Sequence, residues 1–232
     1  MAKAVIIALD FGSAQEALSF LGVFKEEKPY VKIGMELFYK EGPDIVAKIK
    51  DNGHCVFLDL KLYDIPNTVE KAMRSLRALN VDMLNLHAGG GSDMMQAALT
   101  GITREDGTRP LIIAVTMLTS IGQDCLRDEL LITAGMEKTV SHYAKNAMRS
   151  GLDGIVCSPL EARNVKDSCG EAFLAVTPGI RFANDNAGDQ ARIATPALAG
   201  EMGSDYIVVG RSITDSRDPV AAYRRCVNEF FK

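Results

Sequence analysis

The stretch of sequence that decides the fold reads Val56-Phe57-Leu58-Asp59-Leu60-Lys61-Leu62-Tyr63-Asp64-Ile65-Pro66-Asn67-Thr68. Its first half is an apolar run typical of a strand, which we expect Pro66 to stop because proline cannot continue a central strand. Asn67 and Thr68 follow as candidates for the N-cap of a helix. Asp59 and Lys61 are two residues apart in the strand, so their side chains are expected on the same face. The stretch predicts a strand, a turn and a helix, with charged groups at the carboxyl end of the strand.

The composition of the chain is that of an ordinary soluble globular protein. Its 232 residues are 47% hydrophobic and 24% charged, and the net charge of −4 provides no basic field for nucleic acid. The five cysteines are scattered without a C-x-x-C pair, which favours reduced thiols over a zinc site or disulfides. The apolar run Val5–Leu9 is too short for the core of a signal peptide, and no stretch reaches transmembrane length. We therefore expect a cytoplasmic protein that binds neither nucleic acid nor a membrane.

Short β-rich runs alternate with helical segments along the whole chain. Besides the opening stretch, the expected strands are Val5–Asp10, Tyr30–Met35, Met83–Ala88, Leu111–Met117, Gly154–Ser158, Phe173–Pro178 and Tyr206–Gly210. Ser13 and Glu16 form a capping-box pattern at the start of a first helix. Further helices are expected around Asp44–Lys50, from about Thr68 to Leu79, after Ser92, after an insert at Gly122–Gly135, and from Asp218-Pro219 onward.

Eight βα units without a linker or a change in composition predict a single (β/α)8 barrel domain spanning residues 1–232, with parallel strands clad in helices. A doubly wound open sheet is the alternative. It usually carries a glycine fingerprint after its first strand, and Asp10-Phe11-Gly12-Ser13 is not G-x-G-x-x-G. We therefore favour the barrel, whose active site is expected at the carboxyl ends of the strands.

Charges near the strand ends are expected to gather at the mouth of such a barrel, because helices cover the outside of every strand. Asp10 ends the first strand, Lys32 lies in the second, and Asp59 and Lys61 end the third. A layer of structural salt bridges is the alternative, but buried ion pairs rarely repay their desolvation. We therefore interpret the cluster as a functional site. His87, the histidine in the expected fourth strand, is interpreted as a hydrogen-bonded structural residue.

The second half of the chain carries a pattern typical of phosphate binding. Thr177-Pro178-Gly179-Ile180-Arg181 follows the seventh strand and Val209-Gly210-Arg211-Ser212 ends the eighth. Glycines let backbone N–H groups approach an anion, arginines bind phosphate oxygens, and barrel enzymes often hold a phosphate at these two loops. The polar segment Phe182–Asp189 between them is expected to be a lid, or else a solvated loop, and Gln190 and Arg192 end it near the phosphate.

With these residues in hand, the chain closely resembles the orotidine 5′-phosphate decarboxylases. The signature D-x-K-x-x-D-I-x-N-T of that family is complete in Asp59–Thr68. The resemblance extends over nearly the whole chain, through Asp10, Lys32, Leu118-Thr119-Ser120, Thr177–Arg181, Gly188-Asp189-Gln190 and Gly210-Arg211. It implies a barrel that dimerises through its mouths and converts orotidine 5′-phosphate to uridine 5′-phosphate and carbon dioxide, a step of pyrimidine biosynthesis, without a metal or an organic cofactor.

The resemblance also implies a role for each matching residue. Lys61 would protonate the pyrimidine carbon that loses the carboxylate, within a charge network formed by Lys32, Asp59, Lys61 and Asp64. The substrate contacts it implies are Asp10, Lys32 and Asp59, then Thr119 (or Ser120) at the base, and Pro178, Arg181, Gln190, Gly210 and Arg211 toward the phosphate. Asp64, Ile65 and Thr68 would enter the site of the partner subunit.

Two other functions remain open. One is a related Mg²⁺-dependent barrel that decarboxylates a sugar-phosphate β-keto acid or runs an aldol reaction, for which Glu36 would be the added acidic ligand after the second strand. The ending Ile65-Pro66-Asn67-Thr68 favours the pyrimidine nucleotide over it. The other is a barrel that binds a phosphate ligand without catalysis, which the complete set of lysines and aspartates argues against.

Overall fold

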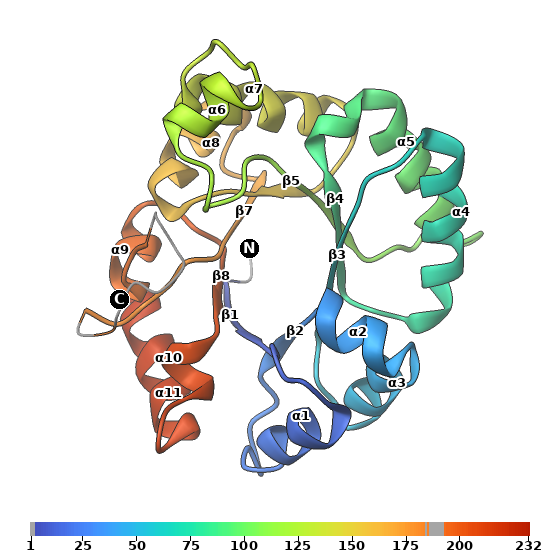
Figure 1. Cartoon of the computed structure of the whole chain (residues 1–232). Helices are drawn as coiled ribbons and strands as arrows, with labels where there is room; N and C mark the ends of the chain where they lie inside the picture. The colour runs from blue at the N-terminus through green and yellow to red at the C-terminus, as the bar shows by residue number, and fades with distance from the viewer. Residues whose placement is uncertain (1–2, 184, 186–192) are drawn as a thin grey trace.

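The computed structural model describes residues 3–183, 185 and 193–232. In this part of the chain, eight parallel strands pair in chain order and close into a barrel, with the helices arranged around the outside (Figure 1). The strands are β1 (Ala4–Ala8), β2 (Tyr30–Gly34), β3 (Val56–Leu62), β4 (Met83–His87), β5 (Leu111–Val115), β6 (Gly154–Val156), β7 (Leu174–Thr177) and β8 (Tyr206–Val209). The predicted (β/α)8 barrel is confirmed, and each strand overlaps the run in which the sequence predicts it.

The helices of the described residues follow the strands in the expected alternation. The α-helices are α1 (Ala14–Leu21), α2 (Met35–Glu41), α3 (Asp44–Asp51), α4 (Pro66–Leu76), α5 (Gly91–Ile102), α6 (Gln123–Asp128), α7 (Met136–Arg149), α8 (Ala162–Cys169), α9 (Pro196–Glu201), α10 (Arg211–Thr214) and α11 (Pro219–Phe230). Short 3₁₀ turns are η1 (Arg77–Leu79), η2 (Ala88–Gly90) and η3 (Pro159–Glu161). None of the helices in the described ranges is long and apolar enough to cross a membrane.

Alternation along the strands decides which side chains reach the mouth of the barrel. In β3, Leu58 and Leu60 pack outward in the large core between strands and helices, whereas Phe57 packs inward with the smaller core inside the barrel. Asp59 is the next inward position after Phe57, so its carboxylate stands directly above that inner apolar layer. Lys32 also faces inward from β2, because Val31 and Ile33 on either side of it pack outward; it lies opposite Phe57 in the register.

The opposite end of the barrel is held by three aspartates, each of which immediately precedes an even-numbered strand. Each carboxylate accepts, at 2.7 Å, a backbone N–H of the strand before it. The pairs are Asp82 with Val56, Asp153 with Ile112, and Asp205 with Ala175. Each carboxylate also forms an ion pair, and the partners in the same order are Lys50, Arg109 and Lys166. We call these arrangements the aspartate clamps, and they join neighbouring strands at the end remote from the mouth.

Helices α4 and α5 lie side by side on the outside of the barrel (Figure 1). Their close approach depends on Gly101 of α5, because a Cβ at this position would collide with the backbone carbonyl of Glu70 in α4. The packing of α4 therefore requires glycine at this point.

Three local expectations from the sequence are wrong. Pro66 does not end β3, which stops at Leu62; it occupies the first turn of α4, where its missing N–H costs nothing. Asn67 and Thr68 consequently lie inside α4, whose N-cap is Ile65 without a side-chain hydrogen bond. The helix α2 directly after β2 was not expected, because Gly34 passes from strand to helix without an intervening loop.

The capping box expected at the start of α1 is only half formed. The hydroxyl of Ser13 accepts the backbone N–H of Glu16, as the pattern predicts. The carboxylate of Glu16 accepts the N–H of Gly12 at 3.2 Å, where a capping box would bring it to the N–H of Ser13 itself.

Candidate active site

A cavity of about 350 Å³ opens at the carboxyl end of the barrel, and all eight strands or the loops after them contribute to its lining. This volume lies in the range of pockets that bind a small molecule. Charged side chains line the part formed by β1 to β3, and apolar side chains line much of the part formed by β5 to β7. The cavity is therefore polar on one side and apolar on the other.

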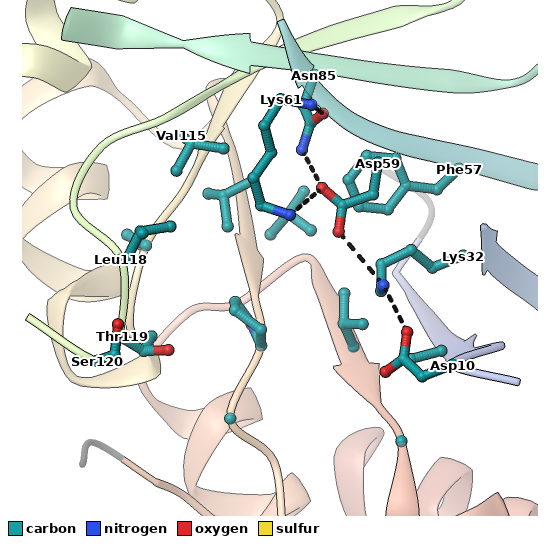
Figure 2. Close-up of a pocket in the computed structure, with 18 of the residues that line it drawn as sticks. Asp10, Lys32, Phe57, Asp59, Lys61, Asn85, Val115, Leu118, Thr119 and Ser120 are labelled. Carbon is teal, nitrogen blue, oxygen red and sulfur yellow. Dashed lines mark hydrogen bonds and ion pairs between the residues drawn. The ribbon is translucent and has the colours of Figure 1, made fainter. Parts of the chain in front are cut away.

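Four charged side chains form a continuous row across β1, β2 and β3 (Figure 2). Lys32 Nζ lies 3.1 Å from Asp10 Oδ1 and 3.3 Å from Asp59 Oδ2. Lys61 Nζ lies 2.7 Å from the other carboxylate oxygen of Asp59. We call Asp10, Lys32, Asp59 and Lys61 the charge row. The sequence predicted these groups at the mouth, and the structure brings all four together there.

The charge row holds its inner members in their ionised forms. Burial by itself would raise the pKa of Asp59, but the neighbouring Lys32 and Lys61 outweigh it, so the pKa of this carboxyl is lowered. Burial would likewise lower the pKa of Lys32, but Asp59 and Asp10 reverse that effect and raise it. At neutral pH Asp59 is therefore a carboxylate and Lys32 an ammonium.

Lys61 has an unusual backbone conformation. Its φ of 52° lies in the left-handed region that residues with a side chain rarely adopt. The register between β3 and β4 shifts between Leu58 and Leu62, so the strand is irregular at this lysine. Backbone strain of this kind costs about 1–3 kcal/mol and is concentrated at functional sites. Simple alternation predicted that Lys61 would face the same way as Asp59, but the irregular backbone also takes part in placing it.

Asn85 of β4 is a site residue that sequence reasoning missed. It is buried, it lines the cavity, and its side chain donates to Asp59 Oδ1 at 2.6 Å (Figure 2). Its side-chain oxygen accepts the backbone N–H of Lys61 at 2.8 Å. A polar residue at an inward position of the apolar strand β4 was the signal in the sequence that could have revealed it.

His87 at the end of β4 does not line the cavity. Its ring lies 5.4 Å from the ring of Tyr63, centroid to centroid. Partial burial lowers the pKa of the imidazole below its usual value, and the positive charge of the nearby Lys61 adds a smaller effect in the same direction. The structural role predicted for His87 stays a prediction.

The wall opposite the charge row comes from β5, β6 and β7. It includes Val115, Val156 and Val176. The loop after β5 adds Thr119 and Ser120, which Figure 2 labels with Val115. The sequence left open whether Thr119 or Ser120 contacts the base, and both line the cavity. This wall provides a mostly apolar surface with two hydroxyl groups across from the charges.

The loops after β7 and β8 form a third part of the cavity. Pro178, Gly179 and Arg181 line it from β7, and Gly210 and Arg211 line it from β8. The sequence predicted these five residues to bind a phosphate or to lie in the loops that bind it, and all five line the same cavity. Gln190 lies outside the described residues, as do Arg192 and most of the segment Phe182–Asp189 expected to be a lid.

The residues expected to serve a partner subunit lie outside the cavity of their own chain. Tyr63 to Thr68 are all exposed, with Tyr63 64% and Ile65 66% exposed. The carboxylate of Asp64 accepts the N–H of Ile65 at 2.6 Å and does not take part in the charge row. Asp64, Ile65 and Thr68 are therefore positioned on the surface beside the mouth.

No cluster of His, Cys, Asp or Glu suited to a metal ion occurs among the described residues. Glu36, which the magnesium hypothesis would require as a ligand, is exposed in the first turn of α2 and does not line the cavity. The carboxylates that do line it, Asp10 and Asp59, are each paired with Lys32. This arrangement does not favour a magnesium site.

Comparison with known proteins gives consistent matches over nearly the entire chain. The sequence model of the orotidine 5′-phosphate decarboxylase / HUMPS family matches residues 3–226. Proteins named orotidine 5′-phosphate decarboxylase from Bacillus anthracis and Bacillus cytotoxicus are 53% and 54% identical over 227 residues, which is 97% of this chain and 95% of each relative.

Two solved structures are also similar. A crystal structure of orotidine 5′-phosphate decarboxylase from Lactobacillus acidophilus matches with a TM-score of 0.87 at 41% identity, covering 99% of this chain and 100% of that one. An uncharacterized conserved protein from Geobacillus kaustophilus matches with the same TM-score at 48% identity, covering 97% and 99% of the two chains.

Proposed function

Because the chain belongs to the orotidine 5′-phosphate decarboxylase / HUMPS family, we propose that it converts orotidine 5′-phosphate to uridine 5′-phosphate and carbon dioxide. It is then a carboxy-lyase of pyrimidine biosynthesis. The observation that carries the proposal is the charge row, which sets two ammonium groups around one carboxylate at the bottom of the cavity.

The reaction breaks a carbon–carbon bond and leaves an electron pair on a ring carbon that has no adjacent electron sink. A cofactor often accepts such charge in other enzymes. In this chain, we propose that fixed charges stabilise it directly, without a metal or an organic cofactor. The ammonium of Lys61 would lie next to the developing carbanion and transfer its proton to that carbon as carbon dioxide leaves.

Asp59 has two roles in this proposal. It anchors Lys61 through the 2.7 Å contact, and its low pKa keeps it ionised at neutral pH. We propose that its negative charge lies beside the carboxylate of the bound substrate, so it would oppose the bound substrate more than the transition state that loses that charge. Both effects lower the barrier of the same step.

Substrate binding would use the remaining walls. Asp10 and Lys32 are suited to the ribose, Thr119 or Ser120 to the edge of the base, and the region of Pro178, Arg181, Gly210 and Arg211 to the phosphate, together with Gln190. A phosphate held by arginines far from the reacting carbon provides binding energy that can raise the rate as well as the affinity. The apolar wall would keep water away from the reacting carbon.

We also propose that the chain works as a homodimer. Two large apolar side chains, Tyr63 and Ile65, are more than half exposed beside the mouth, in the segment that carries Asp64. Contact between two mouths would cover them and bring Asp64, Ile65 and Thr68 of each chain into the site of the other.

The decisive experiment follows the ultraviolet absorbance of orotidine 5′-phosphate incubated with the purified protein. The spectrum should change to that of uridine 5′-phosphate, and EDTA should leave the rate unchanged. Loss of activity on chelation and its recovery with Mg²⁺ would instead support the sugar-phosphate enzyme. Binding of the nucleotide without any spectral change would support a barrel that binds its ligand without catalysis.

A further inference from the structure

Asn85 is hydrogen-bonded to both catalytic members of the charge row at once. Its amide group donates to Asp59 Oδ1 at 2.6 Å, and its oxygen accepts the backbone N–H of Lys61 at 2.8 Å. The carboxylate oxygen that it contacts is the same one that the Lys61 ammonium contacts at 2.7 Å. Two of these contacts join β4 to β3, and the third, between Lys61 and Asp59 within β3, closes the set.

We propose that Asn85 is a positioning residue for decarboxylation, which holds the strained backbone of Lys61 and the carboxylate of Asp59 in their reactive geometry. This inference rests on the proposed function and adds to it a residue on a strand that none of the expected catalytic groups occupies. Asn85 itself would not need to touch the substrate for this role.

The conformation of Lys61 explains why such a residue is needed. The normal ladder of β3 with β4 is interrupted at this lysine, where the strand register shifts. The backbone N–H of Lys61 is instead bound by the side chain of Asn85, which is only 1% exposed. A hydrogen bond at this point supports a φ of 52° that the chain would otherwise tend to leave.

The second hydrogen bond orients the carboxylate of Asp59 and favours its ionised form. Lys32 from β2 and Lys61 from β3 face this carboxylate, Asp10 in the loop after β1 lies beyond Lys32, and His87 lies at the end of β4. The amide of Asn85 is the uncharged donor in this set, and it contributes to the lowered pKa of Asp59. Asn85 therefore orients the carboxylate without adding a charge to the row.

Three variants test this role. Asn85→Ala removes both hydrogen bonds. Asn85→Asp keeps an acceptor for the Lys61 N–H but places a second carboxylate against Asp59. Thr116→Val is the matched control, because Thr116 is 3% exposed and its hydroxyl donates at 2.8 Å to the carbonyl of Val156, away from the charge row. For each variant, kcat, KM, the Kd of uridine 5′-phosphate and the pH profile of kcat are measured.

We expect Asn85→Ala to lower kcat by about 100-fold or more while changing the Kd of uridine 5′-phosphate by less than about threefold, because the groups proposed to bind ribose and phosphate lie on other strands. In Asn85→Asp, like charges on adjacent carboxylates should move the acidic limb of the kcat profile to higher pH. Thr116→Val should keep a near-normal kcat. A fall in kcat of less than about threefold in Asn85→Ala, or an equal fall in Thr116→Val, would overturn the proposal. Should Asn85→Ala not fold, Asn85→Ser removes the same pair of contacts with a smaller polar group.

Crystal structures of the wild-type protein and of Asn85→Ala separate this inference from the proposed function. If the wild-type protein does not release carbon dioxide from orotidine 5′-phosphate, the proposed function fails, and the two structures still decide the positioning role. A Lys61 that leaves the left-handed region, or loses its contact with Asp59, supports it. An unchanged Lys61 backbone and an unchanged contact overturn it.

Discussion

Replacing Asp205 by asparagine would leave the ammonium of Lys166 buried without a countercharge. In the wild-type clamp, Lys166 Nζ lies 2.6 Å from Asp205 Oδ2, and the two side chains are 2% and 9% exposed. The same carboxylate oxygen accepts the N–H of Ala175 at 2.7 Å. The ammonium also donates to the backbone carbonyls of Phe173 and Glu171, at 2.9 and 3.1 Å.

The loss of unfolding free energy in each variant depends on which groups stay buried without a partner. Removing one member of a buried ion pair costs about 3–5 kcal/mol, because the remaining charge stays desolvated. Asp205→Asn and Lys166→Met should each cost this much. In the double variant both charges are absent, and the asparagine oxygen can still accept the N–H of Ala175. The main loss is then that of the Lys166 ammonium as donor to the carbonyls of Glu171 and Phe173, and leaving these carbonyls unpaired costs about 1–3 kcal/mol.

Chemical unfolding in urea, followed by circular dichroism, measures these free energies. In a chain of this length, 1 kcal/mol corresponds to about 2–4 °C, so each single variant should melt about 6–20 °C below the wild-type protein. The double variant should be more stable than either single one. Arg163→Met is the control, because it breaks an exposed ion pair with Glu171 and should leave the melting temperature near that of the wild type. Single variants within about 1 kcal/mol of the wild type, or costs that simply add in the double variant, would refute this account.

Three further predictions concern the site. Lys61→Ala should abolish decarboxylation and leave binding of uridine 5′-phosphate largely intact by calorimetry; near-normal turnover would remove Lys61 as the proton donor. Arg211→Ala should weaken nucleotide binding by about 1.5–3 kcal/mol and also lower kcat; an unchanged kcat would separate phosphate binding from rate acceleration. Mixing inactive Lys61→Ala and Asp64→Ala subunits should restore activity at about a quarter of all sites, because half of the dimers are mixed and each has one intact site. Mixed dimers, verified by native mass spectrometry, that stay inactive would place Asp64 in the site of its own chain.

The barrel could be predicted because its signals are local and repeated. Each strand is a short apolar run, and eight of them alternate with helical segments over the whole chain. Asp59 and Lys32 could be placed at the mouth because helices cover the outside of every strand, and both residues line the cavity there. The missed features depend on boundaries. No turn residues separate β2 from α2, so the start of α2 at Met35 has no signal in the sequence. A proline is compatible with the end of a strand and with the first turn of a helix, so Pro66 alone could not decide between them.

The charge row was predictable because its residue types carry charge. Asp10, Lys32, Asp59 and Lys61 could be grouped because charges on an enclosed strand have few places to go. Asn85 could not be assigned in this way. Its importance depends on a register shift between β3 and β4 and on the left-handed backbone of Lys61, and both arise from the packing of the closed sheet.

The close packing of α4 on Gly101 has a consequence for how this protein can tolerate mutation. Any larger residue at Gly101 would push against the backbone of Glu70 and force α4 outward. Since α4 begins at Pro66, immediately after Asp64 and Ile65, the displacement would carry to the surface segment beside the mouth. Gly101 does not line the cavity, yet a random mutagenesis screen for lost activity should recover substitutions there.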